Sequence, residues 1–402
     1  MSARILVTDG HQRSTLAVVR SLGRAGLDVT VVEDRLPCLA SVSRYCARGL
    51  VAPSPVGTPG AFVDFLTDEV RRSPYDLLIP MTDVTSILVA EHADRLTPHV
   101  RVPLVPWERF SRALDKEYLI RLAGRLNVPA PRTWFVESLE ELRPIEGELS
   151  FPVVLKPRRS KYLAANAWIS EPVTYADSFA ELRRRLKVVH PAVPLPMIQE
   201  RVTGPGCGAF LLCDHGRSKA VFFHRRLREK PPSGGVSVLR ESIPVDRQMR
   251  AYAEALLSAL EWHGVAMVEF KVDVRDGRPL LMEINPRFWG SLQLAIDAGV
   301  DFPGMLAHLA MGEPVEPVFS YAVGVRSRWL LGDLDHLTAC LLKSRKKLQL
   351  PPGFPGRWQT LLEFFRWNPS RTRLEVLRRD DPRPFLLELK EYVKAPFRSR
   401  NA

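Results

Sequence analysis

In the first hundred residues, short apolar runs alternate with longer segments whose apolar residues recur at helical spacing. Residues 4–8 ("RILVT") read as a buried strand, and residues 15–26 place apolar side chains at helical spacing before Gly26, a plausible cap. An open α/β sheet with Rossmann-like topology is therefore predicted. The remaining elements predicted here are strands at 28–34, 76–80 and 100–105 and helices near 61–72 and 84–95.

The loop after the first strand does not carry a dinucleotide-binding fingerprint. An acid after the second strand, such as Glu33 or Asp34, often contacts ribose in nicotinamide enzymes. The fingerprint also needs several glycines, so that the backbone can approach a pyrophosphate, and "TDGHQRST" contains only Gly10. The sequence therefore gives little support to a nicotinamide cofactor.

After Pro106 the elements no longer alternate strictly, which is typical of an α+β unit. The apolar strand "FPVVLKP" ends with Lys156, and "LPMIQERVTG" ends with Gln199 and Glu200. A lysine that closes an apolar strand calls for an explanation, because lysines are rarely buried without a partner. Also predicted are a helix carrying Asp115 and Lys116, helices at 176–188 and 248–262, and strands at 208–213 and 219–225.

Residues 264–285 contain two β-rich apolar runs separated by Asp276 and Gly277, a strong hairpin signal. A loop of only those two residues would place Glu269 and Glu283 on opposite faces of the ribbon. A three-residue loop with a bulge at Gly277, or a five-residue loop, shifts the pairing by one residue and brings both glutamates to one face. We predict such an odd loop.

Polar side chains occupy every second position at the end of this hairpin. Glu283, Asn285 and Arg287 alternate along "LLMEINPRFWG", so a strand would present them on the same surface as Glu269. An arbitrary E-x-N-x-R is more often an exposed polar face. Two carboxylates and an amide oxygen on one face also suit Mg²⁺, with Mn²⁺ as an alternative ion. The adjacent arginine would then offset charge on a transferring phosphoryl group.

Length and composition narrow the class of protein. A chain of 402 residues predicts two or three domains, and 46% hydrophobic with 25% charged residues argues against disordered and fibrous classes. The N-terminal residues run directly into strand-like sequence, and no apolar run approaches the roughly 20 residues of a membrane helix, so the expected compartment is cytoplasmic. Five cysteines without a C-x-x-C pair predict neither a disulfide framework nor a zinc site.

Much of the basic charge lies in the last part of the chain. Residues 331–402 hold fifteen Lys and Arg against eight Asp and Glu, and so carry +7 of the net charge of +12. We interpret this extension as a solvated, partly helical appendage, with a membrane-surface or protein-docking patch as the alternative. The chain has no aromatic-interleaved recognition motif, so no specific nucleic acid is predicted as a partner.

Several of these segments, taken in order, resemble the ATP-grasp superfamily over roughly residues 1–310, and bacterial ATP-grasp carboxylate–amine ligases most. The segments are Asp115-Lys116, "VVLKP", "MIQERVTG", "AMVEF" and "LLMEINPR". The resemblance implies an α/β and α+β chain with a Rossmann-like N-terminal domain before a two-lobed ATP-grasp domain. The predicted boundaries are 1–108 for the first domain, 109–330 for the ATP-grasp domain with lobes at about 109–200 and 201–330, and 331–402 for the basic, partly helical C-terminal extension.

The resemblance also implies a role for each matched residue. Lys116 and Lys156 would lie along the phosphates of ATP, and Glu200 would accept the adenine amino group at the hinge between the lobes. Gln199 belongs either to the site or to the core. The implied ligands of the Mg²⁺ ions are Glu269, Glu283 and Asn285, and Arg287 would stabilise the phosphoryl group in flight.

The sequence departs from the family pattern at two places. Family members usually cover the phosphates with a glycine-rich loop, whereas "RRSKYLAANA" contains no glycine. Side chains of this segment, Ser160 and Lys161 among them, could replace the backbone donors, and an exposed basic turn is the alternative. A carboxylate for the ribose is missing after the hinge, so the ribose contact stays unassigned.

Residues 222–244 contain a cluster of cations before a Pro-Pro-Ser-Gly-Gly loop. The cations suit a carboxylate substrate and the acyl phosphate formed from it, and the loop suits a lid. A solvated basic loop is the alternative interpretation. His224 and Arg226 are the catalytic candidates from this segment, beside Arg287. His11 and Asp83, on loops at the carboxyl ends of predicted strands, are further candidates for substrate contacts or cleft closure.

The sequence therefore predicts an ADP-forming carboxylate–amine ligase that acts through an acyl phosphate on a small-molecule carboxylate and a small-molecule amine. An ATP-grasp carboxylase that forms carboxyphosphate is one alternative, and a non-catalytic ATP-binding scaffold protein is another. A homodimer is left open, because related enzymes are often dimers.

Overall fold

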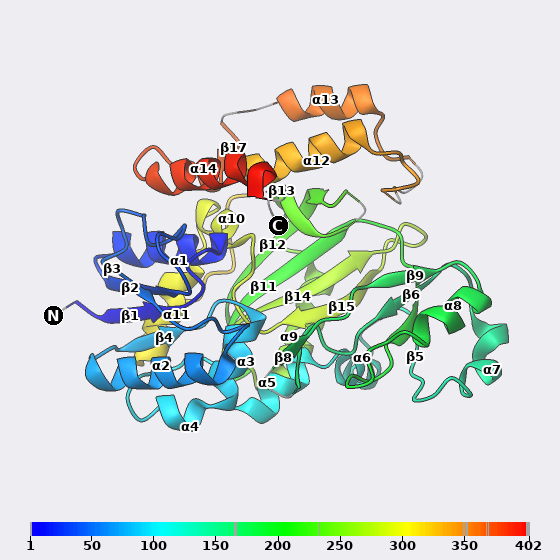
Figure 1. Ribbon diagram of the computed structural model, residues 1–402, viewed down its shortest axis with the longest axis horizontal. Coiled ribbons are helices and arrows are strands. Elements are labelled where there is room, and N and C mark those ends of the chain that lie inside the picture. The colour runs from blue at the N-terminus through cyan, green and yellow to red at the C-terminus, as the bar shows by residue number, and fades with distance from the viewer. Residues whose placement is uncertain are drawn as a thin grey trace.

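The computed structural model describes residues 2–398 except 165–166, 233, 349, 351–352, 367 and 369. An N-terminal α/β unit occupies one side of the molecule, a large and mainly antiparallel sheet runs through the middle, and a small lobe lies on the other side (Figure 1). The C-terminal helices lie across one end of the large sheet (Figure 1). Within the described residues, every helix falls short of the length or the hydropathy that a bilayer span requires.

The N-terminal unit is built on a four-stranded parallel sheet in the order β3-β2-β1-β4. The predicted strand at 100–105 is wrong, because only Arg101 forms a bridge, with Leu77. The loop after β1 requires glycine at position 10, because a Cβ there would lie 2.3 Å from the sulfur of Cys38. The elements are β1 (Arg4–Val7), α1 (Arg13–Arg24), β2 (Asp28–Glu33), β3 (Arg48–Val51), α2 (Pro59–Arg72), β4 (Leu77–Ile79), α3 (Asp83–Glu91) and α4 (Ala93–Leu96).

The small lobe carries a four-stranded sheet in the order β5-β10-β6-β9. Two helices lead into it, and Asp115 separates them because its side chain accepts a hydrogen bond from the Tyr118 amide and caps the second. The elements are α5 (Trp107–Leu114), α6 (Lys116–Arg125), β5 (Thr133–Trp134), α7 (Leu142–Ile145), the 3₁₀ helix η1 (Glu146–Glu148), β6 (Val153–Lys156), the paired strands β7 (Tyr162–Ala164) and β8 (Ala167–Ile169), β9 (Thr174–Ala176), α8 (Phe179–Leu186) and β10 (Met197–Glu200).

The large sheet has seven strands in the order β15-β14-β11-β12-β13-β16-β17. Phe288 and Trp289 are buried in the core between this sheet and the N-terminal unit. The elements are β11 (Gly206–Asp214), β12 (Arg217–Lys230), β13 (Val236–Ser242), α9 (Arg247–Ala259), β14 (Gly264–Val272), β15 (Pro279–Asn285), α10 (Leu292–Asp297), α11 (Phe302–Met311), β16 (Arg326–Arg328) and β17 (Thr372–Leu374).

The hairpin of β14 and β15 brings its glutamates to one face, but not through the predicted odd loop. Val272 pairs with Pro279, so an even number of residues, 273–278, separates the strands. The register then shifts by one residue beyond the pair Phe270–Leu281, so that Glu269 lies opposite Glu283. The extra residue is Met282, a β-bulge within the strand. The prediction that the two glutamates share one face is confirmed, but the one-residue shift lies within the strand and not in the loop.

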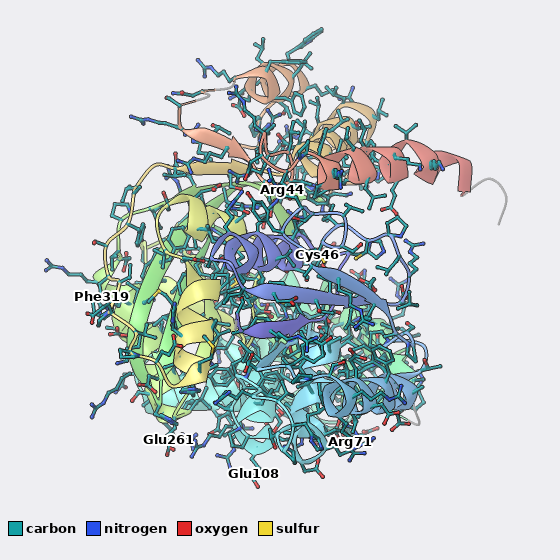
Figure 2. The ribbon with its side chains drawn as sticks, turned by 90° about the vertical axis from the view of Figure 1, so that its left-hand side faces the viewer. Arg44, Cys46, Arg71, Glu108, Glu261 and Phe319 are labelled. Carbon is teal, nitrogen blue, oxygen red and sulfur yellow. The ribbon has the colours of Figure 1, made fainter. Side chains whose placement is uncertain are left out.

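The C-terminal residues are integrated into the fold, which corrects the interpretation of a solvated appendage. Strand β17 pairs in parallel with β16 at the edge of the large sheet. Buried Arg20 of α1 donates to Asp381 at 2.8 Å, and buried Arg240 lies 2.5 Å from Glu375. Arg44, labelled at this boundary in Figure 2, donates its backbone N–H to Asp381 at 3.0 Å. The helices of this segment are α12 (Leu330–Leu342), α13 (Arg357–Phe365) and α14 (Arg383–Arg398).

Candidate active site

Two cavities meet at the acidic face of the β14–β15 hairpin. The first, here called the inter-lobe cleft, has a volume of about 900 Å³ and lies between the small-lobe sheet and the large sheet. The second, here called the N-terminal cavity, has about 780 Å³ and lies between the N-terminal unit, the large sheet and the C-terminal segment. Both cavities are lined by Lys161, Arg226, Gly235, Glu269 and Glu283.

Glu269, Glu283 and Asn285 form an oxygen-rich group where the cavities meet. The Asn285 amide donates to Glu283 at 3.2 Å, and Lys116 Nζ lies 3.2 Å from the other Glu283 oxygen. Burial alone would raise the pKa of Glu283, but Lys116 and Lys156 outweigh it and lower that pKa to about 2. Glu283 is therefore ionised at neutral pH. Hard oxygen donors balanced by mobile cationic side chains fit a divalent ion such as Mg²⁺.

Glu269 faces the same junction from the neighbouring strand. Its pKa is raised, mainly because the carboxyl group is buried. Arg226 Nη2 donates to its Oε2 at 2.5 Å and also pairs with Glu229 at 3.0 Å. The two glutamates therefore each have a cationic partner, one from the small-lobe side and one from β12.

Lys156 ends β6 at the wall of the inter-lobe cleft, as the apolar strand before it predicted. Its Nζ lies 3.6 Å from the sulfur of the bulged residue Met282, which is a weak acceptor. Burial, opposed by Glu283, lowers the pKa of Lys156 to about 8. A nearly buried ammonium group beside a weak acceptor is suited to receive an anionic ligand.

The predicted hinge residues end β10 and differ in what their side chains do. Gln199 is buried, and its amide donates to Thr133 Oγ1 at 2.9 Å, so the side chain stabilises the small-lobe sheet although the residue borders the cleft. Glu200 accepts a hydrogen bond from the Arg132 amide at 3.2 Å and borders the cleft. Glu200 is therefore placed to contact a ligand, and the Gln199 side chain is already satisfied.

The glycine-free segment after β6 is held against the N-terminal end of α6. Arg158 is nearly buried and donates to Glu117 at 2.7 Å, while Arg159 lies 3.5 Å from Asp115. Ser160 accepts a hydrogen bond from Lys116 at 3.1 Å and, like Lys161, borders the inter-lobe cleft. The segment therefore presents side-chain donors to the cleft. Ala165 and Asn166 lie outside the described residues.

The sequence and the fold of this chain resemble those of known proteins. A family model described as ATP-grasp in the biosynthetic pathway with Ter operon matches residues 195–331. The solved structure of an L-amino acid ligase from Bacillus licheniformis superposes with a TM-score of 0.60 at 18% identity and covers 78% of this chain and 75% of that one. Residues 195–331 therefore match an ATP-grasp family, and the chain shares the fold of this ligase.

Two further proteins resemble the chain, one in its fold and one in its sequence. N5-carboxyaminoimidazole synthetase from Staphylococcus aureus has a TM-score of 0.63 at 11% identity, covering 81% of this chain and 80% of that one. D-aspartate ligase from Enterococcus faecium is 24% identical over 231 residues, which are 54% of each protein. The chain thus spans about half the length of this curated relative.

Arg287 reaches from the hairpin to the N-terminal unit. Its guanidinium makes two hydrogen bonds to Asp83, at 2.6 and 3.0 Å, and a third to Asn285 Oδ1 at 3.3 Å. Asp83 stands at the start of α3 beside Thr82, whose hydroxyl donates to Asp9 at 3.0 Å. These contacts fix the arginine between the acidic group and the N-terminal cavity.

Asp9 and Thr82 lie on the two strand-end loops, 9–14 and 80–83, that were predicted to lie at the ligand-binding edge, but only His11 and Asp83 were singled out there. Asp9 has a left-handed φ of 59°, which costs energy for a residue with a Cβ and is held here by hydrogen bonds from three threonines. Its neighbour His11 borders the N-terminal cavity and donates its amide to Glu33 at 2.8 Å. Glu33 thus stabilises this loop.

His224 and Arg226 both border the N-terminal cavity, from β12. His224 is fully buried, its Nε2 lies 2.8 Å from Ser291 Oγ, and its ring stacks on Phe210 at 4.6 Å. Burial holds the pKa of His224 well below its usual value, so the ring is neutral. Its Nδ1 has no hydrogen-bond partner in the part of the chain that the structure describes.

The loop after β12 closes the junction of the two cavities. Gly235 lines both of them, and a Cβ there would lie 2.4 Å from the carbonyl oxygen of Lys230, so only glycine fits without a shift. Ser233, part of the predicted lid, lies outside the described residues. The remaining residues of the loop are therefore placed to cover a ligand that bridges the two cavities.

The C-terminal segment contributes residues to both cavities that no sequence motif indicated. His336, Phe354 and Glu363 border the inter-lobe cleft, and Trp329, Glu388 and Glu391 border the N-terminal cavity. Local spacing could not reveal them, because their positions depend on how the last helices pack across the sheet.

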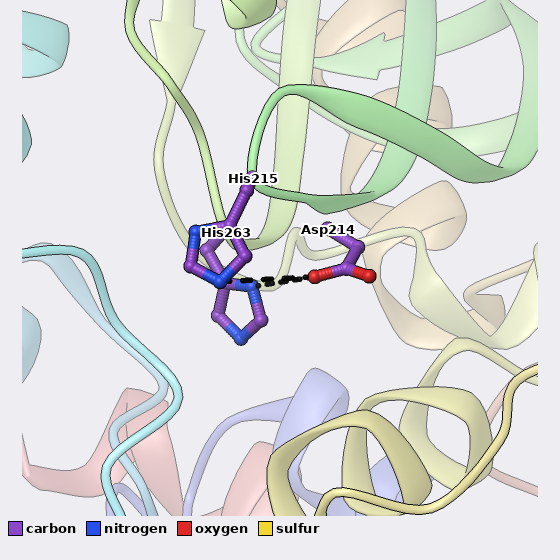
Figure 3. A group of neighbouring side chains, drawn as sticks. All are labelled: Asp214, His215 and His263. Atoms are coloured by element: carbon purple, nitrogen blue, oxygen red, sulfur yellow. Dashed lines mark ion pairs between the residues drawn. The ribbon is translucent and has the colours of Figure 1, made fainter.

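A different cluster of metal-ligating residue types lies outside both cavities, where β11 turns into β12 (Figure 3). His263 Nδ1 lies 3.4 Å and His215 Nε2 3.9 Å from Asp214 Oδ1. Lys219 lies 3.8 Å from the other oxygen of Asp214 and already compensates its charge. This cluster occupies the end of the strands opposite to the acidic pair, because β11 ends and β14 begins there.

Proposed function

We propose that this protein is an ATP-dependent, ADP-forming carboxylate–amine ligase. The observation that carries the proposal is the position of Glu269 and Glu283 at the one place where two cavities meet. A phosphoryl transfer between two bound molecules requires their reacting groups to meet at a point where negative charge is offset. The comparisons support the same class of chemistry, because the matched proteins include an L-amino acid ligase and a D-aspartate ligase.

ATP occupies the inter-lobe cleft in this proposal. Val154 and Met282 give the cleft apolar walls from its two sheets, and Glu200 at the hinge accepts a hydrogen bond from the adenine amino group. Lys156 and Lys116 lie along the phosphates as positive charges. The fall in the pKa of Lys156 to about 8 is reversed when phosphate oxygens approach, so phosphate binding favours its protonated form.

The metal ion of the reaction would be Mg²⁺, held by Glu269, Glu283 and Asn285. When bound, it neutralises the phosphate charge and orients the transferring group. Lys116 and Arg226, which now pair with the two carboxylates, are then free to contact phosphate oxygens. The two cations would then compensate phosphate charge, and the metal ion would compensate the charge of the two carboxylates.

The carboxylate substrate occupies the N-terminal cavity. Its oxygen attacks the γ-phosphorus, the bond to the β–γ bridging oxygen breaks, and ADP and an acyl phosphate form. The neutral amine then attacks the acyl carbon, the bond between that carbon and the phosphate oxygen breaks, and inorganic phosphate leaves with the original carboxylate oxygen and takes up the proton that the amine loses. Arg287 and Arg226 stabilise the charge on the phosphoryl group, and Gly235 and the loop around it shelter the acyl phosphate from water. His224, a weak base because of its low pKa, serves as a hydrogen-bonding residue at this site.

The experiment that tests this function follows ADP release with panels of carboxylates, amines and bicarbonate, and identifies products by mass spectrometry. Substrates found in this way are then labelled with ¹⁸O in the carboxylate. The proposal expects an amide product and one ¹⁸O atom in the released phosphate. Release of AMP and pyrophosphate, or ADP release that depends only on bicarbonate, would exclude it. The reaction is assigned to the cytoplasm, where ATP is available.

A further inference from the structure

The wall that the C-terminal segment gives to the N-terminal cavity is acidic and aromatic. Trp329, which precedes α12, and Glu388 and Glu391 of α14 line the cavity together with Arg13 of α1. The Trp329 indole N–H donates to Glu388 Oε1 at 2.7 Å and fixes the direction of the carboxylate. We call Trp329, Glu388 and Glu391 the α14 wall.

The arginines of this cavity already have carboxylate partners. Arg287 is paired with Asp83, and Arg226 with Glu269. Arg13 is paired with Glu375 and stacks on the Trp329 ring with its guanidinium carbon 3.9 Å from the ring centroid. These arginines therefore do not need a carboxylate from the α14 wall.

Glu388 differs from the other carboxylates of the cavity. Its Oε2 is buried and makes no hydrogen bond in the described part of the chain, and the carboxylate forms no ion pair there. The charged groups around it are Arg13, Glu375 and Glu391, with Arg240 behind Glu375, so two positive and two negative neighbours balance and leave the charge of Glu388 itself uncompensated. Burial raises the pKa of Glu388 to about 7. A buried acceptor without a donor is costly and is satisfied best by a charged donor from a ligand.

We propose that the α14 wall binds a protonated amino group of a substrate, and that the ligase therefore acts on a molecule that carries an ammonium group besides the group that reacts. This inference rests on the proposed function, because it assigns the N-terminal cavity to the substrates. The ammonium group belongs either to an amino acid whose carboxylate is activated or to a diamine whose second amino group attacks. Glu388 binds it, and Trp329 is a positioning residue that holds Glu388.

The same site gives the binding a defined pH dependence. The Glu388 carboxyl must be ionised to bind a cation, so affinity for the ammonium group falls as the pH drops through about 7. Aliphatic ammonium groups stay protonated up to a pH of about 10, so affinity is highest above 7 and below that value. An uncharged partner of the same shape shows no such profile.

The test measures binding to the full chain by calorimetry, in the presence of Mg²⁺ and a non-hydrolysable ATP analogue. The ligands are pairs that differ by one amino group: aspartate and succinate, leucine and 4-methylpentanoate, lysine and 6-aminohexanoate, and 1,5-diaminopentane and pentylamine. We expect the amino member of at least one pair to bind on the order of tenfold more tightly, as one charge-assisted hydrogen bond would provide. The pair that responds shows whether the amino acid or the diamine is the source.

Glu388→Gln should abolish that preference and its pH dependence, while Glu391→Gln, at a more exposed position of the same helix, should weaken it less. Equal binding within every pair, or a preference that survives Glu388→Gln, would overturn the proposal. Binding of the ATP analogue alone reports on the folded state of each variant and on the inter-lobe cleft. Equal binding within every pair by a wild-type protein that still binds nucleotide and releases ADP refutes the α14 wall alone, whereas a wild-type protein that binds no nucleotide refutes the ligase.

Discussion

The inter-lobe cleft and the N-terminal cavity share one acidic boundary but are assembled in different ways. The charged groups of the cleft, such as Lys156 and Glu200, come from strand ends and can be located from the strands that carry them. Those of the N-terminal cavity come from α1, α3, β12 and α14, which are up to several hundred residues apart in the chain. The side chains proposed to bind ATP are thus placed by local strands, and those proposed to contact the substrate are placed by long-range packing.

The largest expected effect lies at the boundary that both cavities share. Glu283→Gln keeps the shape of the side chain and removes the charge that Lys116 and Lys156 stabilise. We expect the rate of ATP turnover to fall on the order of a thousandfold, as when a charge-stabilising group of an active site is lost. ADP release at saturating substrate measures it, with Glu261→Gln at an exposed surface position as the control. Turnover close to that of wild type would remove the metal assignment.

The second-largest effect is expected on the packing of the C-terminal segment, which forms part of the N-terminal cavity. Asp381→Asn removes the charge that buried Arg20 binds, and should lower the free energy of unfolding by about 3 kcal/mol. The control is the neighbouring Asp380→Asn, whose ion pair with Arg24 is exposed and should contribute less than about 1 kcal/mol. Denaturant unfolding measures both. Equal stability of the two variants would mean that the C-terminal segment is not held by this contact.

A third variant acts on the inter-lobe cleft alone. Lys156→Met removes the cation expected along the phosphates, and should raise the KM for ATP about tenfold, which corresponds to about 1.4 kcal/mol. The KM for the other substrates should change little, because Lys156 does not border the N-terminal cavity. Lys187→Met, at an exposed position, is the matched control. An unchanged KM for ATP would place the phosphates elsewhere.

The smallest effect is expected at Gln199, which borders the cleft but donates to Thr133. Gln199→Leu should cost about 1 kcal/mol of stability, the value of one hydrogen bond, and leave the KM for ATP almost unchanged. Thermal unfolding and steady-state kinetics test the two parts. A large rise in KM without loss of stability would show that Gln199 belongs to the site and not to the core.

The hairpin shows how far the sequence could predict the site. The alternation of Glu283 and Asn285 was sufficient to predict that they share a face, because side chains on a strand alternate strictly. The position of the bulge was not predictable, since a one-residue shift can be absorbed in the loop or at any point of the ladder, here at Met282. The choice depends on what packs on both sides of the strand.

The C-terminal segment shows the opposite case. Its composition suggested solvent exposure, because fifteen basic residues outnumber eight acidic ones. The structure uses two of those acids, Glu375 and Asp381, as buried partners of arginines in distant segments, and composition cannot indicate which charges will be paired. The predicted strand at 100–105 was also wrong. An apolar run can predict a strand, but it cannot predict how many of its residues will pair, and here only Arg101 forms a bridge, with Leu77 of β4.

The walls that the C-terminal helices give to both cavities also set an order of events during synthesis. A ribosome delivers the Rossmann-like unit, the small lobe and the acidic hairpin first, and α14 emerges after all of them. A chain cut before α14 would therefore contain Arg13, Asp83 and Glu283 but would lack the Glu388 and Glu391 side of the N-terminal cavity.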